Sequence, residues 1–161
     1  MEKIERMYLA HYLNGTPGTE ADTYERLGED LEDYSVELGA QVDKIKNILG
    51  KTSVKISSYE KSGSVEPFYA AKGSKLFDFL QKIIDEDLTL DKVKTDMVEV
   101  KLWETESPTS TYPAIKEEVY IEVVSYGGDT TGYQIPFNVH YTGKKEKGTF
   151  DVSKNTFAPA A

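Results

Sequence analysis

The chain has 161 residues, 28 of them acidic and 19 basic, so its net charge is −9, and it contains no cysteine and only two histidines. This length suits one domain over residues 1–161 with a core of its own. Without cysteine, a disulfide framework, a thiolate metal site and a cysteine nucleophile are excluded. The negative charge argues against binding nucleic acid by neutralising its phosphates.

The N-terminal residues predict neither a signal nor a membrane segment. Met1–Arg6 lacks the apolar run of a secretion signal, and the longest apolar runs of the chain are too short to cross a bilayer. We therefore expect no membrane partner and a protein that is made in the cytosol and stays there or leaves by another route. A first strand is predicted over Arg6–Leu13, within a flexible N-terminal region.

The next segment holds nearly all of the net charge. Residues 1–19 balance at zero and residues 44–161 carry −1, whereas between them only Arg26 opposes nine acids. These are Glu20, Asp22, Glu25, Glu29, Asp30, Glu32, Asp33, Glu37 and Asp43. Two interpretations stay open: a solvated acidic loop that aids solubility, or an anionic surface that excludes or steers a charged partner.

Two periodicities mark the middle of the chain. Thr52–Ser58 alternates apolar and polar residues, as a strand does. Ser74–Asp87 has the spacing of a helix that starts at a capping serine and frays at its acidic C-terminal end, because acids there oppose the helix dipole. One face of that helix carries Leu76, Leu80, Ile83 and Ile84.

Three further strands are predicted in the C-terminal half. Met97–Trp103 alternates, Glu118–Val124 is rich in β-branched residues, and Tyr133–Tyr141 has apolar residues at every odd position. Pro136 has no N–H to donate, so the last strand should lie at an edge or carry a bulge.

Glycine-rich segments predict the connections between these strands. Ser125–Gly132 is expected to join two strands as a hairpin, and Gly143–Gly148 to turn a second hairpin into Thr149–Val152. Loops are expected at Asn14–Ala21, Glu60–Glu66, Thr105–Pro113 and Ser153–Ala161. Residues 153–161 should form a flexible tail, or one ordered by a neighbouring subunit. The fold class is therefore mainly antiparallel β with one flanking α-helix.

The sequence offers little for catalysis. His11 and His140 are its only imidazoles, and both lie in strand patterns. His140 falls on a polar face and is expected at the surface or at an interface. No serine lies in the setting of a nucleophile elbow, and the paired carboxylates of the acidic segment are expected to be solvated rather than to act as a glycosidase pair.

Two segments have the spacing of binding loops but lack the residues that such loops need. Asp85, Asp87 and Asp91 are spaced somewhat like a calcium loop, yet Leu90 stands at its glycine position and Asp96 at its bidentate glutamate. Gly143–Thr149 lacks the lysine of a phosphate-binding loop. We predict no catalytic, cofactor-binding or metal-ligating residue, no cofactor, and no enzymatic activity.

The strand edges and the tyrosines favour self-assembly instead. Edge strands are normally blunted unless they are used for pairing. Eleven tyrosines offer large amphipathic side chains of the kind that interfaces use. The composition therefore leans towards a structural, self-assembling role.

Four segments follow one another in a recognisable order: Arg26–Asp33, Val42–Gly50, Tyr59–Ala70 and the predicted helix. Their succession resembles the major tail tube proteins of long-tailed, siphovirus-like bacteriophages, above all those of phages that infect Gram-positive bacteria. The resemblance runs from about Tyr24 to Val100 and continues beyond in the order of the strands. The order of the segments carries it, because none of them is a catalytic fingerprint.

The resemblance implies a β-sandwich or half-barrel flanked by a helix, a fold shared with contractile tail tubes, tail-like bacteriocins and type VI secretion tubes. It implies that six copies join their sheets into a ring and that rings stack into a hollow tube, which DNA traverses during infection without specific binding. A long hairpin around residues 43–69 and the terminal arms are implied to make the ring-to-ring contacts. The implied partners are tape-measure and tail terminator or tip proteins, in a virion built in the host bacterial cytoplasm.

An acidic subunit repeated around a ring gives a negative wall, which repels the DNA backbone and lets it slide. We expect carboxylates from Glu20–Asp43, or from strands of the inner sheet, to face that lumen. Two alternatives stay open: the tube of a phage-derived tail-like bacteriocin or injection machine, and a monomeric β-sandwich binding module. The module is expected to stay near its mass of 18.1 kDa at high concentration, whereas the tube protein should form rings or polymerise.

Overall fold

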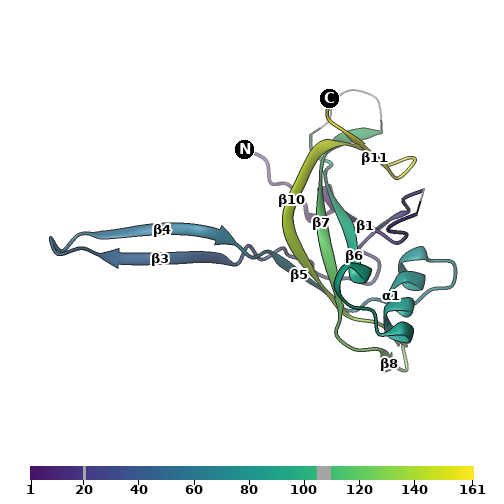
Figure 1. Ribbon diagram of the computed structural model, residues 1–161. Coiled ribbons are helices and arrows are strands. Elements are labelled where there is room, and N and C mark those ends of the chain that lie inside the picture. The colour runs from purple at the N-terminus through teal and green to yellow at the C-terminus, as the bar shows by residue number, and fades with distance from the viewer. Residues whose placement is uncertain (20, 105–109) are drawn as a thin grey trace.

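A curled antiparallel sheet is the centre of the computed structural model, which describes residues 1–19, 21–104 and 110–161 (Figure 1). Its strands run in the order β11-β10-β7-β6-β1-β2, and β5 pairs with β10 as well. The strands are β1 (Leu9–Asn14), β2 (Tyr24–Arg26), β5 (Ser62–Val65), β6 (Lys94–Lys101), β7 (Thr111–Val123), β10 (Phe137–Asp151) and β11 (Thr156–Pro159). The predicted class, mainly antiparallel β with one helix, is confirmed.

The sheet buries apolar side chains on both of its faces, because successive residues of a strand point to opposite sides. Along β6, Met97 belongs to one cluster, and Val98 and Val100 to the other. The larger cluster lies under the helix and includes Leu13, Val65, Val119, Ile121, Ile135, Phe137 and Val139. The smaller one includes Ala10, Tyr12, Tyr24, Ala114 and Phe150.

The helix α1 (Lys75–Glu86) forms where the sequence predicts it. Ser74 caps it, since its Oγ accepts a hydrogen bond from the N–H of Phe77 at 3.1 Å. The predicted face is buried at Leu76, Leu80 and Ile83. The helix ends at Asp87, whose left-handed backbone (φ 49°) reverses the chain.

The remaining elements lie outside this sheet. The 3-10 turns η1 (Arg6–Tyr8) and η2 (Leu90–Val93) precede β1 and β6. The small hairpin of β8 (Gly127–Asp129) and β9 (Gly132–Gln134) joins β7 to β10, as predicted for Ser125–Gly132. β3 (Ala40–Lys46) and β4 (Thr52–Tyr59) pair with each other and project as a long ribbon (Figure 1). We call this ribbon, residues 40–59, the arm, and the rest of the chain the body.

The predicted second hairpin at Gly143–Gly148 is wrong. β10 continues through this segment, and residues 145–148 pair with residues 114–117 of β7. The register shifts between Tyr141 and Lys145, so the glycine-rich stretch forms an irregularity within a strand rather than a turn. Gly143 adopts φ 90°, and its N–H donates to Glu117 Oε2 at 3.1 Å, which holds the bulge in place.

The predicted strand Tyr133–Tyr141 is broken in two. β9 ends at Gln134 and β10 begins at Phe137, with Pro136 between them. Pro136 cannot donate to a ladder but its carbonyl accepts from the N–H of Val124 at 3.1 Å. The predicted inward positions Ile135, Phe137 and Val139 are fully buried.

Three boundaries also differ from the sequence predictions. The first strand begins at Leu9, because Arg6–Tyr8 form a 3-10 turn. The tail predicted over 153–161 contains a strand, β11, which pairs with Gly148–Asp151 and half-buries Phe157 against the smaller cluster. The predicted loop Glu60–Glu66 contains β5. Of the predicted loop Thr105–Pro113, residues 105–109 lie outside the described residues.

Candidate assembly surfaces

The arm is an antiparallel ribbon with little else around it. Val42 lies opposite Ile56 and Lys44 opposite Val54, and the strand predicted over Thr52–Ser58 forms as part of β4. Every residue of β3 and β4 is exposed. A two-stranded ribbon in water is at best marginally stable by itself. Because all residues of its strands are exposed, the arm gains little stability from packing against the body.

The arm also exposes large apolar side chains. Ile45 is 62% exposed and Val54 61%, values expected for surface lysines rather than for β-branched apolar residues. The full set, with Leu38 just before β3, is Leu38, Val42, Ile45, Ile48, Leu49, Val54, Ile56 and Tyr59. Many exposed apolar side chains gathered on one element mark a site that another surface covers.

The tip of the arm is an ordered turn. The side-chain oxygen of Asn47 accepts hydrogen bonds from the N–H groups of Leu49 at 2.9 Å and Lys51 at 3.0 Å. Gly50 closes the turn with φ 78°. Ile48 and Leu49 are therefore held outward, with exposed fractions of 103% and 76%.

The root of the arm is anchored by a buried ion pair. Lys61, two residues beyond β4, pairs with Glu117 of β7, and their side chains are only 13% and 6% exposed. The ammonium group also lies 5.1 Å from the centre of the Tyr141 ring. On the other side of the root, Glu37 and Ser62 exchange backbone hydrogen bonds at 2.8 and 3.0 Å. These contacts fix the direction in which the arm leaves the body.

Buried tyrosines surround that anchor. The hydroxyls of Tyr34 and Tyr141 lie 2.7 Å apart. Burial raises the pKa of Tyr34 to about 12, and burial together with the neighbouring Tyr34 raises the pKa of Tyr141 further. Gly63 of β5 packs beneath Tyr34, where a Cβ would meet the ring carbon Cζ at 2.6 Å. The root thus has no room for a larger residue.

The two histidines differ in their surroundings. His11 is buried on β1, with its Nε2 3.1 Å from Glu99 Oε1 and its ring edge-on to Tyr34. The hydrogen bond from His11 is the main cause of the lowered pKa of Glu99. His140 is exposed on β10, as predicted, and its Nε2 lies 2.6 Å from Glu122 Oε1.

The acids of the segment predicted to carry the net charge lie in different parts of the structure. Glu20 lies outside the described residues. Asp22 accepts a hydrogen bond from Asn14 at 2.9 Å, and Asp43 lies on the arm opposite Lys55. Glu25 closes the N-terminus of α1: its carboxylate accepts from Ser74 Oγ at 2.7 Å and from the N–H of Lys75 at 2.8 Å. Sequence analysis missed this role of Glu25, since its partners lie some fifty residues away.

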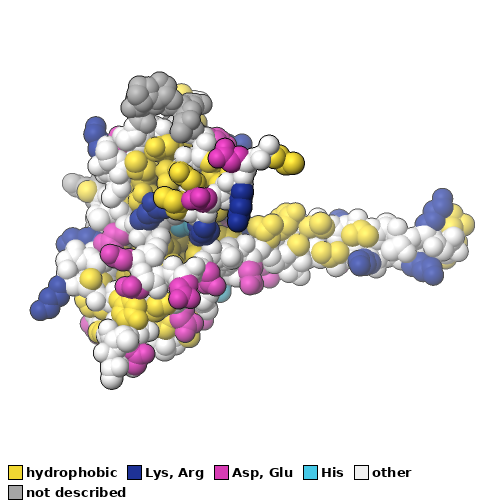
Figure 2. All heavy atoms as spheres, turned by 180° about the vertical axis from the view of Figure 1, so that it is seen from behind, with side chains coloured by type: hydrophobic (Ala, Val, Ile, Leu, Met, Phe, Trp, Pro, Cys, Tyr) yellow, Lys and Arg dark blue, Asp and Glu magenta, His cyan; other side chains and the backbone are white. Residues whose placement is uncertain are grey.

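The other five acids form a surface strip. Glu29, Asp30, Glu32, Asp33 and Glu37 are all exposed and lie between β2 and the root of the arm. We call residues 28–39 the acidic strip; no lysine or arginine falls within it. The arm that follows carries four lysines and one aspartate. Figure 2 shows this separation, with acidic side chains on the body and lysines towards the far end of the arm.

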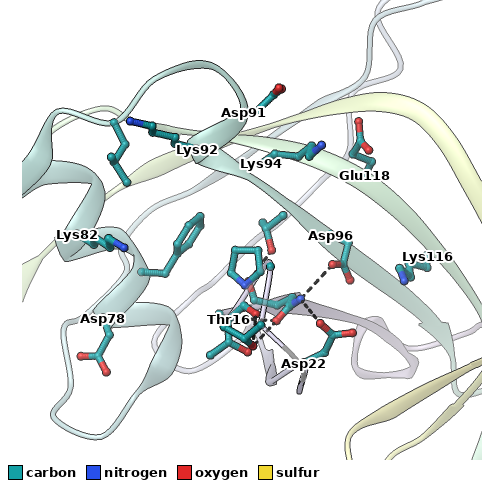
Figure 3. Close-up of a pocket in the computed structure, with 18 of the residues that line it drawn as sticks. Thr16, Asp22, Asp78, Lys82, Asp91, Lys92, Lys94, Asp96, Lys116 and Glu118 are labelled. Atoms are coloured by element: carbon teal, nitrogen blue, oxygen red, sulfur yellow. Dashed lines mark hydrogen bonds between the residues drawn. The ribbon is translucent and has the colours of Figure 1, made fainter.

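A broad groove on the body has a different character. It lies between α1, the sheet and the loop after β1, with a volume of about 1150 Å³ (Figure 3). Asn14 holds that loop, donating to Asp22 and to Asp96, the latter at 3.1 Å. Seven acids and six lysines line the groove. Because the two signs nearly cancel, the groove gives no strong field for an anion or a cation.

The described residues contain no cluster of three or more His, Cys, Asp or Glu side chains placed to hold a metal ion. Across the same ranges, none of the helices has the length and apolar character needed to span a membrane. The spacing of three aspartates in the sequence somewhat resembles that of a calcium loop. In the structure they are spread over the end of α1 and η2: Asp85, Asp87 and Asp91.

The features that the structure brings together are a curled open sheet, a single flanking helix and a projecting apolar arm, which together define a fold like that of phage tail tubes. Among solved structures, the SPP1 tail tube matches with a TM-score of 0.62 and 15% sequence identity, over 90% of this chain and 78% of that one. A chain of the anti-feeding prophage (AFP) baseplate aligns over 94% of this chain and 99% of its own, at 12% identity and a TM-score of 0.44. No protein-family model and no curated protein sequence matches the chain.

Proposed function

We propose that the chain is the repeating subunit of a phage tail tube, in which six copies form a ring and stacked rings enclose a channel for DNA. The observation that carries this proposal is the likeness of fold to the SPP1 tail tube over 90% of the chain. The arm supports it, since its exposed apolar residues need a partner surface that a lone subunit lacks. Tape-measure and terminator or tip proteins are the expected partners in the virion.

The charge of the body supports a channel that DNA crosses without binding. The arm is basic, so the body is more acidic than the net −9 of the whole chain. Repeated around a ring, such subunits repel a polyanion and leave it hydrated and free to slide. The exposed carboxylates of the sheet, such as Glu122, are the candidates for that wall. A net positive ring on the inner wall of the assembled tube would contradict this part of the proposal.

Negative-stain electron microscopy of the purified chain tests the proposal directly. We expect rings or tubes with a central hole at high protein concentration, and sedimentation of species far heavier than the 18.1 kDa monomer. Assembly is expected to be slow where the arm must settle on its partner first. A chain that stays monomeric under all conditions, with a melting temperature that rises on adding a small ligand, would establish a binding module instead.

A further inference from the structure

The arm cannot be covered by its own body. Its root is fixed by the Lys61–Glu117 pair and by the backbone bonds of Glu37 with Ser62, and from there the ribbon leads away from the sheet (Figure 1). Its apolar residues are exposed on both faces, at Val42 and Ile56 on one and Ile45 on the other. A surface that buries them therefore belongs to another molecule.

The acidic strip has the complementary charge. A groove of about 580 Å³ runs beside it, with Met7, Leu27 and Leu31 among its lining residues. Acids of the strip, Glu29, Glu32 and Asp33, line the same groove. It therefore combines an apolar surface with carboxylates, whereas the arm combines apolar side chains with lysines.

Two arginines also line this groove, so three carboxylates against two guanidinium groups leave it a net −1. Neither arginine forms an ion pair with a carboxylate of the strip within the described residues. The Nη2 of Arg6 donates to the carbonyl of Tyr34 at 3.0 Å, and the Nη2 of Arg26 donates to the carbonyl of Met7 at 2.8 Å. Both guanidinium groups are thus turned to the backbone of the groove wall. No ion pair joins Glu29, Glu32 or Asp33 to any described residue.

We propose that the arm of one copy docks on the acidic strip of a neighbouring copy, with Ile48 and Leu49 in the groove beside Leu31 and the arm lysines facing Glu29, Glu32 and Asp33. The apolar contacts supply affinity, and the charges supply orientation and speed of encounter. Donor and acceptor are different surfaces of one chain, so every copy gives one arm and receives one, which extends into rings or stacks. This inference rests on the proposed function in requiring that copies associate.

Charge reversal tests the pairing of the two surfaces. Variant one carries Lys44→Glu and Lys46→Glu on the arm, variant two Glu29→Lys and Glu32→Lys on the strip, and variant three carries all four changes. A control carries Asp85→Lys and Glu86→Lys, which change the net charge as variant two does at exposed positions on α1. Circular dichroism and thermal melts establish that each variant is folded.

We expect variants one and two each to raise the concentration needed for assembly at least tenfold at low salt, measured by sedimentation velocity. Variant three should return to within about threefold of the parent, and the control should match the parent. The differences should shrink at 0.5 M salt, because exposed charges are then screened. Normal assembly of variant two, or failure of variant three to recover, would overturn the docking proposal while leaving the tube proposal intact.

Crosslinking gives a second, independent readout, because the chain has no cysteine of its own. Leu49→Cys and Glu32→Cys are made as separate single variants and mixed under mild oxidation. We expect a covalent dimer from the mixture, and little from Leu49→Cys mixed with Glu86→Cys. Crosslinks and charge rescue in oligomers that never form rings would support docking but overturn the tube. A parent that remains monomeric at millimolar concentration, without a crosslink, overturns both.

Discussion

The arm and the body are built from the same kind of strand, but their apolar residues have different surroundings. Val98 and Val100 in β6 are completely buried, whereas Val42 and Val54 in the arm are 49% and 61% exposed. The body is thus stabilised by its own core, whereas the apolar side chains of the arm remain exposed and contribute little to the stability of the single chain. The difference predicts that the body folds as a unit by itself and that, under the proposed assembly, the arm gains its contacts afterwards.

The difference between the arm and the body is tested most directly by removing an apolar side chain from each region and comparing the loss of stability. Phe137→Ala should lower the free energy of unfolding by about 3–5 kcal/mol, because it leaves a cavity in the larger cluster. The matched arm variant Ile56→Ala should change it by less than about 0.5 kcal/mol. Urea unfolding of the dilute monomer measures both. Similar losses in the two variants would mean that the arm is packed in the monomer.

The junction between the two regions is the next test. Lys61→Met leaves Glu117 buried without its cation, which should cost about 3 kcal/mol. Adding Glu117→Leu should recover part of that loss, because an apolar pair needs no desolvation of charge. The recovery stays incomplete because the N–H of Gly143 loses its acceptor. Thermal melts of the single and double variants decide. A double variant no more stable than Lys61→Met would contradict the view that the unpaired charge of Glu117 causes the loss of stability.

The same junction should respond to alkaline pH. The pKa of Tyr34 in the folded chain is raised to about 12 from an ordinary 10, so folding favours the neutral phenol. Its contribution is full below pH 10 and is lost as the pH rises from 10 to 12, about 3 kcal/mol in all. Tyr34→Phe should start about 1 kcal/mol lower at pH 8 and fall less steeply over that window. Parallel stability curves for parent and variant would contradict this.

The smallest expected change in stability comes from the tip of the arm. Ile48→Ser with Leu49→Ser should leave the unfolding of the dilute monomer within about 0.5 kcal/mol of the parent, since both side chains are in water. Assembly, followed by light scattering, should nevertheless be strongly impaired. The matched pair Leu90→Ser with Val124→Ser, also exposed, serves as the control. If the tip variant assembled as well as the parent, the arm tip would not be part of the interface.

Local signals in the sequence predict those parts of the fold that depend on neighbours along the chain. The helix follows from the spacing of Leu76, Leu80 and Ile83 and from its cap at Ser74, all within a few turns. The inward positions of β10 follow from a period of two at Phe137 and Val139. In both cases the residues that decide the structure are close together in sequence.

Features that depend on distant partners could not be predicted. Gly143–Gly148 has the composition of a turn. It nevertheless continues a strand, because β7 pairs with β10 both before the bulge, up to Tyr141, and after it, from Lys145. Residues 153–161 look too apolar-poor to pack, yet β11 forms because the end of β10 offers an edge. The alternation of Thr52–Ser58 predicts a strand correctly but says nothing of what covers it. The charge of the acidic segment was visible at once, whereas the cap formed by Glu25 depends on a helix fifty residues away.

The edge of β10 that faces away from β7 has a further consequence. β5 occupies its beginning and β11 its end, and the stretch between them contains the bulge at Gly143 with Lys144, Lys145 and Lys147. Bulges and lysines are the features by which proteins close an exposed edge to stray strands. We therefore expect this stretch to discourage amyloid-like pairing of strands between copies in concentrated solution.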